Sequence, residues 1–250
     1  MSVNERPSER RTSARTAVVW EALQVALDQP GAFSDQGARI IDVGGGTGGF
    51  AVRLSELGHR VTVVDPSPDA LAALGRRARE VGVDVTGLQG DVSDLADLID
   101  SAADPVDVVL CHGVLEVVDD PAAALATIRR VLRPGGTLSL LVAQRHAAVI
   151  ARAMAGHFPQ ALALLAGEPD ASAPSRTGHR FAADEAASLL VGAGFEIASI
   201  HGVRVFADLV PGSLVDLEPG AAAALVELER TVAERAEYFP LATQLHLLAL

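Results

Sequence analysis

Apolar residues along the chain follow two spacings, one typical of strands and one typical of helices, and the two alternate. Short runs of aliphatic and β-branched residues, typical of buried strands, alternate with stretches in which apolar residues recur three or four positions apart, as in helices. The predicted strands are residues 39–43, 59–64, 83–88, 107–111, 137–143, 194–205 and 244–250. The predicted helices are residues 12–28, 50–57, 68–81, 121–132, 184–191 and 218–237, with a helix or turn at 92–101. This alternation predicts a doubly wound α/β fold, a parallel sheet with helices on both faces.

Two segments depart from the alternation. Residues 1–11 are polar and rich in arginine, and we expect them to form a flexible N-terminus. Residues 144–172 form a long Ala/Leu stretch of helical character, which indicates a lid insertion over residues 144–180. The remaining pattern predicts one domain over residues 12–250, beginning with the helix at 12–28.

The basic residues limit the chemistry that is available. All 20 are arginines, which excludes a Schiff-base lysine and the lysine of a P-loop. A net charge of −12 disfavours a broad nucleic-acid surface, although a local arginine patch remains compatible with it.

The remaining composition indicates a cytoplasmic protein. Cys111 is the single cysteine, so no intramolecular disulfide can form, and a reducing compartment is the natural interpretation. No apolar run approaches the ~20 residues that span a bilayer, so we expect no membrane partner. The histidines and the cysteine lack metal-ligand spacing, so we expect no metal site.

A glycine loop follows the first predicted strand. Gly44, Gly46 and Gly49 match the G-x-G-x-x-G pattern, in which glycines let a ligand approach the backbone at a helix N-terminus. This pattern alone allows an NAD-dependent enzyme. Asp42, two residues before the loop, would repel a pyrophosphate and favours a ligand that carries ammonium and sulfonium charges.

Two further acids follow the next two strands. Asp65 ends the second strand, where a carboxylate can accept both hydroxyls of a ribose. Asp91 follows Gly90 after the third strand and can accept a hydrogen bond from an adenine amine. Three acids at the carboxyl ends of successive strands are typical of the ligand crevice of a doubly wound sheet.

With these motifs the sequence resembles the class I S-adenosylmethionine-dependent methyltransferases. The stretch 42–48 is similar to their first motif, Asp65 to their ribose-binding acid, Gly90-Asp91 to their adenine-side motif, and 132–136 to the turn before strand five. The resemblance implies a Rossmann-like seven-stranded sheet of order 3-2-1-4-5-7-6 with strand 7 antiparallel. It also implies S-adenosyl-L-methionine as cofactor, with S-adenosyl-L-homocysteine as product.

A narrower resemblance links the chain to the bacterial tRNA 5-carboxymethoxyuridine methyltransferases. Residues 15–20, 111–121 and 202–208 carry it. The match implies that Arg15 and His112 contact the methyl donor. By the same match Gly44, Gly45 and Asp65 bind the donor too, and the wider class I motifs add Asp42, Gly46, Gly90 and Asp91 to the predicted cofactor site.

The acceptor side leaves alternatives open. His112 can be a donor-binding residue, a general base or a structural histidine, and we rank these in that order. Arg204 ends strand six in an apolar alternation and either faces an anionic substrate or lies at the sheet margin. The first hypothesis for the acceptor is the wobble-uridine carboxylate of tRNA. A small-molecule O- or N-methyltransferase and, more remotely, an NAD(P)-dependent oxidoreductase are the alternatives.

Overall fold

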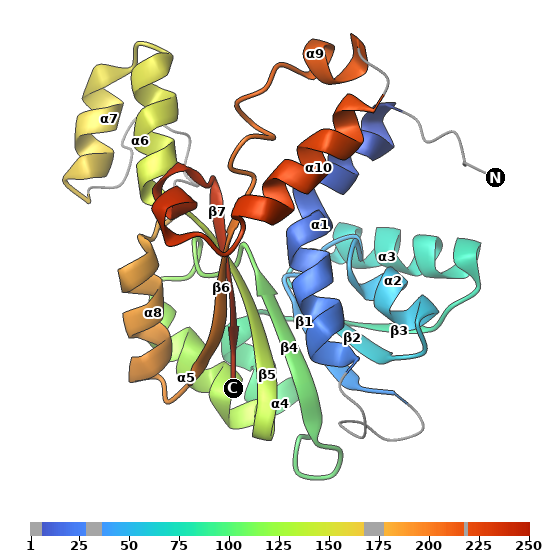
Figure 1. Ribbon diagram of the computed structural model, residues 1–250. Helices are drawn as coiled ribbons and strands as arrows, with labels where there is room; N and C mark the ends of the chain where they lie inside the picture. The colour runs from blue at the N-terminus through green and yellow to red at the C-terminus, as the bar shows by residue number, and fades with distance from the viewer. Residues whose placement is uncertain (1–6, 29–36, 168–177, 218–219) are drawn as a thin grey trace.

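One mixed sheet of seven strands organises the computed structural model, in the order β3-β2-β1-β4-β5-β7-β6 (Figure 1). The structure describes residues 7–28, 37–167, 178–217 and 220–250, without the side chains of residues 7–15 and 216–217. Strand β7 pairs antiparallel with both β5 and β6, and the other pairs are parallel, so the predicted topology is confirmed. The strands are β1 (Arg39–Val43), β2 (Arg60–Asp65), β3 (Val85–Gln89), β4 (Val106–His112), β5 (Leu132–Ala143), β6 (Ile197–Val203) and β7 (Gln244–Ala249).

Helices cover both faces of the sheet and extend beyond its carboxyl edge. Helices α4, α5 and α8 cover one face, and α1, α2, α3 and α10 cover the other. Helices α6 and α7 form one projection above the sheet, and α9 with part of α10 forms a second (Figure 1). The helices are α1 (Pro7–Leu27), α2 (Ala51–Glu56), α3 (Pro68–Val81), η1 (Val92–Asp94), α4 (Leu95–Leu98), α5 (Pro121–Val131), α6 (Arg145–Met154), α7 (Phe158–Leu165), α8 (Ala183–Gly192), α9 (Gly212–Leu217), α10 (Ala221–Val232) and η2 (Ala236–Leu241).

The apolar pattern of the central strands explains their place in the middle of the sheet. Ile40, Ile41, Val109 and Leu110 are fully buried, because β1 and β4 are covered by helices on both faces. The carboxyl ends of β1, β2 and β4 therefore meet at one edge of the sheet. That edge is where open α/β sheets bind their ligands.

Three expectations about element bounds need correction. Helix α1 begins at Pro7 and not at residue 12, while residues 1–6 lie outside the described part of the chain. The Ala/Leu stretch is not one helix: α6 and α7 are separated around Gly156, whose φ of 78° suits glycine, and residues 168–177 are not described. The helix expected at 218–237 is α10 followed by the short η2, which contains Pro240.

Strand β6 is also shorter than the expected segment 194–205. Among the described residues, no helix is both long enough and apolar enough to cross a membrane.

Candidate active site

Close contacts at Gly44 and Gly45, and positive φ angles at Gly44 and Gly46, shape the glycine loop after β1. Gly44 donates its N–H to the carbonyl of Val64 at 2.8 Å, and its φ is 67°. A Cβ on Gly45 would lie 2.5 Å from Oδ2 of Asp42. Gly46 has a φ of 55°, which a residue with a Cβ rarely adopts. The loop therefore needs glycine at all three positions.

Asp42 lies beneath this loop as a buried acid. Its side chain is 3% exposed. Burial, and secondly the negative charge of Asp65, raise the pKa of Asp42 to about 7. A cation bound above the loop would favour the ionised form, so Asp42 suits a positively charged ligand.

Asp65 ends β2 with both carboxylate oxygens oriented by the backbone. Oδ2 accepts the N–H of Gly46 at 2.9 Å, and Oδ1 accepts the N–H of Ser67 at 2.8 Å. An ionised carboxylate has about four acceptor positions, so capacity remains for further donors. Asp65 also lines the cavity described below, where that capacity suits the two hydroxyls of a ribose.

Asp91 is held as the N-cap of η1. Its Oδ1 accepts from the N–H of Ser93 at 2.7 Å and from the Ser93 hydroxyl at 2.6 Å, while its own N–H donates to Asp94. The Ser93 hydroxyl lowers the pKa of Asp91, which keeps it ionised. Its neighbour Gly90 leaves no space for a Cβ, which would lie 2.6 Å from Leu98.

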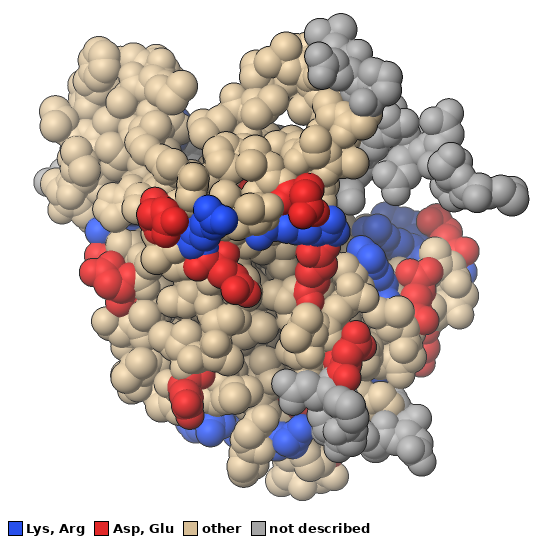
Figure 2. Space-filling view, viewed as in Figure 1, with Lys and Arg blue, Asp and Glu red and all other residues tan. Residues whose placement is uncertain are grey.

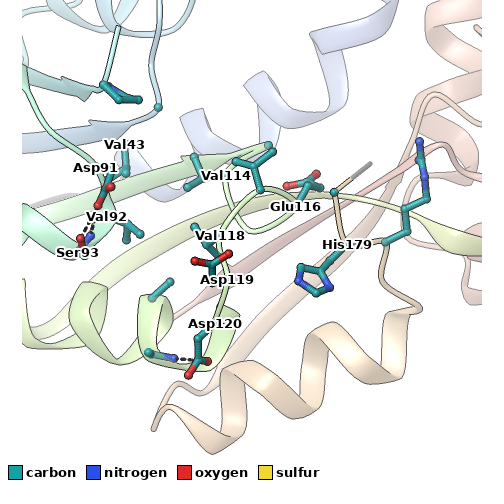
Figure 3. A pocket seen from close by; sticks show the side chains of 18 of the residues that line it. Val43, Asp91, Val92, Ser93, Val114, Glu116, Val118, Asp119, Asp120 and His179 are labelled. Carbon is teal, nitrogen blue, oxygen red and sulfur yellow. Dashed lines mark hydrogen bonds between the residues drawn. The ribbon is translucent and has the colours of Figure 1, made fainter. Parts of the chain in front are cut away.

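A cavity of about 1320 Å³ opens at this edge of the sheet and extends under α6 and α7. Its acidic lining comes from the strand ends and from the loop between β4 and α5 (Figure 3). Its arginines come from α6 and from the segment before α8. The acids are Asp65, Asp91, Glu116, Asp119 and Asp120, and the arginines are Arg145, Arg152 and Arg180. The cavity thus has an acidic wall and an arginine wall.

Glu116 connects the two walls. Its Oε1 accepts the N–H of Ala143 at 2.6 Å, and its carbonyl accepts the N–H of His179 at 2.7 Å. A Cβ on Gly178 would lie 2.0 Å from that carbonyl, so the two segments pack tightly here. Burial raises the pKa of Glu116, and Oε2 has no hydrogen-bond partner among the described residues. From the sequence alone Glu116 has no assigned role, because a carboxylate four residues after His112 fits a solvated or capping position equally well.

His112 ends β4 beside the cavity but is not among the described residues that line it. Nε2 lies 2.9 Å from the hydroxyl of Ser139, and the ring meets that of Phe50 at a centroid distance of 4.9 Å. Burial lowers the pKa of His112 to about 4, so the imidazole is neutral at pH 7. With Nε2 engaged, Nδ1 is the nitrogen that remains for a ligand.

Arg204 has an unusual backbone and a committed side chain. Its φ is 60°, the one positive value among described residues other than glycine. Its guanidinium contacts Asp208 at 2.5 Å and donates to Oε1 of Gln244 at 3.3 Å. Arg204 is not among the described residues that line the cavity. The backbone of Arg15 lies in α1, but its side chain is outside the described part of the structure.

Glu229 of α10 was missed by the sequence analysis. It is fully buried and accepts the N–H groups of Val205, Phe206 and Ala207 at 2.9, 2.8 and 2.7 Å. These three donors directly follow Arg204 and converge on one carboxylate. Glu229 therefore fixes the turn after β6, and a glutamate on an amphipathic helix carries no sequence signal for such a contact.

Known proteins share both the fold and the order of these elements. A family described as a methyltransferase domain matches residues 41–140. The tRNA 5-carboxymethoxyuridine methyltransferase of Escherichia coli K12 is 30% identical over 243 residues, which cover 94% of this chain and 87% of that protein. The chain is a class I S-adenosylmethionine-dependent methyltransferase and belongs to the family of that enzyme.

The chain is also similar to other methyltransferases, over half of its length or in fold. A ubiquinone biosynthesis O-methyltransferase of Xanthomonas axonopodis is 36% identical over 120 residues, covering 48% of this chain and 49% of that protein. The structure of magnesium protoporphyrin IX methyltransferase from Synechocystis, which contains S-adenosyl-L-homocysteine, has a TM-score of 0.59 at 17% identity and covers 82% of this chain and 84% of that one. A Mesorhizobium loti S-adenosylmethionine-dependent methyltransferase has a TM-score of 0.57 at 22% identity, covering 94% and 99%.

The comparisons establish S-adenosylmethionine as the cofactor, in place of the NAD(P) alternative. The acids near the glycine loop fit this cofactor, because Asp42 beneath the loop favours a cation and Asp65 in the acidic wall offers acceptors for hydroxyl groups. Among the described residues, no group of three or more His, Cys, Asp or Glu side chains is arranged to hold a metal.

Proposed function

We propose that this methyltransferase esterifies a carboxylate, and that its acceptor is wobble 5-carboxymethoxyuridine in tRNA. The observation that carries the proposal is the division of the cavity into an acidic and an arginine wall. The methyl donor is cationic at its sulfonium and ammonium groups, which suits the acids. An anionic acceptor suits the arginines. The E. coli relative, similar over almost the whole chain, supports tRNA as the source of that anion.

Each site residue has a role in this proposal. The donor lies against the glycine loop and the strand ends, and α6 with α7 serves as a lid within residues 144–180. Arg204, held by Asp208 outside the lining of the cavity, acts on the acceptor side by exchanging this partner for the anionic acceptor. The proposed donor-binding residues are Arg15, Asp42, Gly44, Gly45, Gly46, Asp65, Gly90, Asp91 and His112.

The reaction needs positioning more than covalent help. A carboxylate oxygen of the acceptor attacks the methyl carbon in line with the sulfonium, a new O–CH₃ bond forms, and the S–CH₃ bonding pair returns to sulfur. The products are a methyl ester and S-adenosyl-L-homocysteine. No general base is required, because a carboxylate is already ionised at neutral pH. A neutral His112 is compatible with this mechanism.

The acceptor is tested directly by incubation with S-adenosylmethionine and tRNA that carries unmethylated 5-carboxymethoxyuridine. Nucleoside mass spectrometry should show the methyl ester. A cytoplasmic location follows from this acceptor. Binding of S-adenosyl-L-homocysteine without ester formation would overturn the tRNA assignment and leave the methyltransferase assignment intact.

The arginine wall is tested by Arg180→Ala. Arg180 lines the cavity, and its positive charge partly opposes the rise that burial causes in the pKa of Glu116. Loss of a charge-assisted hydrogen bond to the acceptor should lower kcat/KM by about 10–100-fold, with the donor Kd unchanged. Arg79→Ala is the matched control, because Arg79 is exposed on α3 and donates a hydrogen bond to the carbonyl of Gly75. Equal kcat/KM for the two variants would contradict the role of this wall.

A small acidic molecule is the second candidate acceptor. The net charge of −12 opposes the binding of an extended phosphate backbone. On the face shown in Figure 2, arginines and acids are interspersed and no broad basic surface appears. The chain also departs from the tRNA-modifying family that it resembles. Leu209 stands where that family carries an aromatic residue, and Thr243-Gln244 stands where it carries an Arg-Tyr pair. A panel of small aromatic and aliphatic carboxylic acids, assayed for methyl esters, would identify this alternative if tRNA is inert.

A further inference from the structure

A row of polar side chains crosses one face of the sheet beneath α1 and α10. It consists of His112 on β4, Ser139 on β5, His246 on β7 and His201 on β6. They share a face because Ser139 pairs with Leu110, two residues before His112, and His246 pairs with both Leu141 and His201. Ser139 and His246 are fully buried, and the rest of this face is packed with apolar residues. The reaction proposed above uses only the first member of the row.

The Ser139 hydroxyl joins two imidazoles. Its Oγ lies 2.9 Å from Nε2 of His112 and 2.8 Å from Nε2 of His246. His201 stacks on His246 at a centroid distance of 5.5 Å, but the Nδ1 atoms of both rings have no hydrogen-bond partner among the described residues. The hydrogen-bonded relay is therefore His112–Ser139–His246, and His201 lies outside it.

Counting protons limits the possible states of this relay. Burial lowers the pKa of both His112 and His246, so each neutral ring carries one N–H. Ser139 contributes one further proton, which makes three donors for two hydrogen bonds. One donor must therefore stay unpartnered within the relay: the Ser139 hydroxyl, Nδ1–H of His246 or Nδ1–H of His112.

The position of each group decides between these three states. An unsatisfied buried donor costs about 1–3 kcal/mol, and Ser139 and His246 are fully enclosed. Nδ1 of His112 is buried too and has no hydrogen-bond partner among the described residues, but His112 lies at the end of β4, where the next residue, Gly113, lines the cavity. Of the three positions, only the His112 end adjoins the cavity, so a ligand oxygen can accept the unpartnered proton there and remove its cost. His246 then donates from Nε2 to Ser139, and Ser139 donates to Nε2 of His112.

We propose that Ser139 and His246 are positioning residues that hold His112 as its Nδ1–H tautomer, so that Nδ1 donates a hydrogen bond to a carboxylate oxygen of the methyl donor. The proposal rests on the donor-binding role of His112 given above. In this state Nε2 accepts from Ser139 and Nδ1 carries the proton, so no lone pair is left for general-base catalysis. His112 contributes to donor binding and not to proton transfer.

The tautomer is measured by NMR on protein labelled with ¹⁵N-histidine, with the His112 signals assigned from their loss in His112→Gln. We expect a protonated Nδ1 and an unprotonated Nε2 at pH 7, and the reverse pattern at His246. A protonated Nε2 at His112, or an imidazolium at pH 7, overturns the proposal. This readout needs neither donor nor acceptor, so it is independent of the proposed function.

The consequence for binding is measured by calorimetry with S-adenosyl-L-homocysteine. Ser139→Ala should weaken binding about tenfold and broaden or shift the His112 signals, because the ring loses its orienting partner. Ser139→Thr restores the hydroxyl and should recover most of the affinity. His201→Gln removes the stacked ring outside the relay and should leave both the affinity and the His112 tautomer unchanged.

The outcomes separate the two proposals. Unchanged affinity and an unchanged His112 tautomer in Ser139→Ala would overturn the relay while leaving donor binding intact. Failure of the wild-type protein to bind S-adenosyl-L-homocysteine would instead count against the proposed function.

Discussion

The two walls of the cavity are built in different ways. The acidic wall comes from strand ends and from the loop between β4 and α5, with side chains tied to the backbone, as Asp65 is to Gly46 and Ser67. The arginine wall consists of side chains on segments that follow β5, braced by contacts such as the paired hydrogen bonds from Arg145 to Glu185 at 2.8 and 2.7 Å. The first wall lies within the matched methyltransferase domain, and the second lies beyond residue 140.

This difference separates what the fold determines from what individual side chains determine. A site made of backbone N–H groups and tight glycines changes only if the strand ends change, which suits a donor common to the family. A site made of long side chains on inserted helices changes one residue at a time, which suits acceptors that differ between relatives. Substitutions in the two walls should therefore have separable effects on donor and acceptor binding.

Asp65→Ala should give the largest loss of affinity, and this loss should affect donor binding and not acceptor binding. It removes the acceptor for two backbone N–H groups and, in the proposed site, for two ribose hydroxyls. At about 1.5–3 kcal/mol for each hydrogen bond to a charged group, the Kd for S-adenosyl-L-homocysteine should rise about 10²–10⁴-fold. Calorimetry measures this change. Asp69→Asn, in the first turn of α3, is the matched control and should bind as the unaltered protein does. A tenfold or smaller loss in Asp65→Ala would mean that the acidic wall does not hold the ribose.

The two walls also differ in how far sequence reasoning could describe them. The glycine loop and the acids Asp65 and Asp91 follow from periodicity and spacing, because local backbone geometry requires particular residues there. The strand order follows from the resemblance to the class I methyltransferases. Ser139 and His246 come together only through strand register, and Glu229 reaches the turn after β6 from a helix 22 or more residues away. Such contacts depend on tertiary packing that no local pattern encodes.

Glu229→Gln tests whether acceptor binding depends on the buried hydrogen bonds that fix the turn after β6. The amide keeps one acceptor oxygen but brings two donors into a site that already contains three N–H groups. We expect the free energy of unfolding to fall by about 1–3 kcal/mol, measured by urea titration. The acceptor KM should rise about tenfold, because Arg204 loses its fixed backbone, while the donor Kd stays constant.

The control for this substitution lies on the same helix. Arg230→Ala removes an exposed ion pair with Glu21 and should cost no more than about 1 kcal/mol. If Glu229→Gln weakened donor binding as much as acceptor binding, the two walls would not be independent.

The last prediction is a pH dependence of donor binding that comes from Asp42, beneath the glycine loop, and not from the arginine wall. Burial, then the charge of Asp65, raise the pKa of Asp42 to about 7, so the acid is mostly protonated at pH 6. A bound cation favours the ionised form, and donor binding should therefore release a proton below pH 7. Because only the ionised fraction binds well, affinity should fall about tenfold per pH unit below 7 and level off above it. His112, with a pKa of about 4, stays neutral over this range and adds no pH dependence to donor binding.

The raised pKa also means that Asp42 lowers the free energy of unfolding as pH rises from about 4 to 7, the opposite of an ion-paired acid. Calorimetry with S-adenosylmethionine in two buffers of different ionisation enthalpy measures the released proton. Asp42→Asn should abolish both the proton release and the pH dependence; a pH-independent affinity of the unaltered protein would show instead that Asp42 is already ionised and that burial does not control its charge.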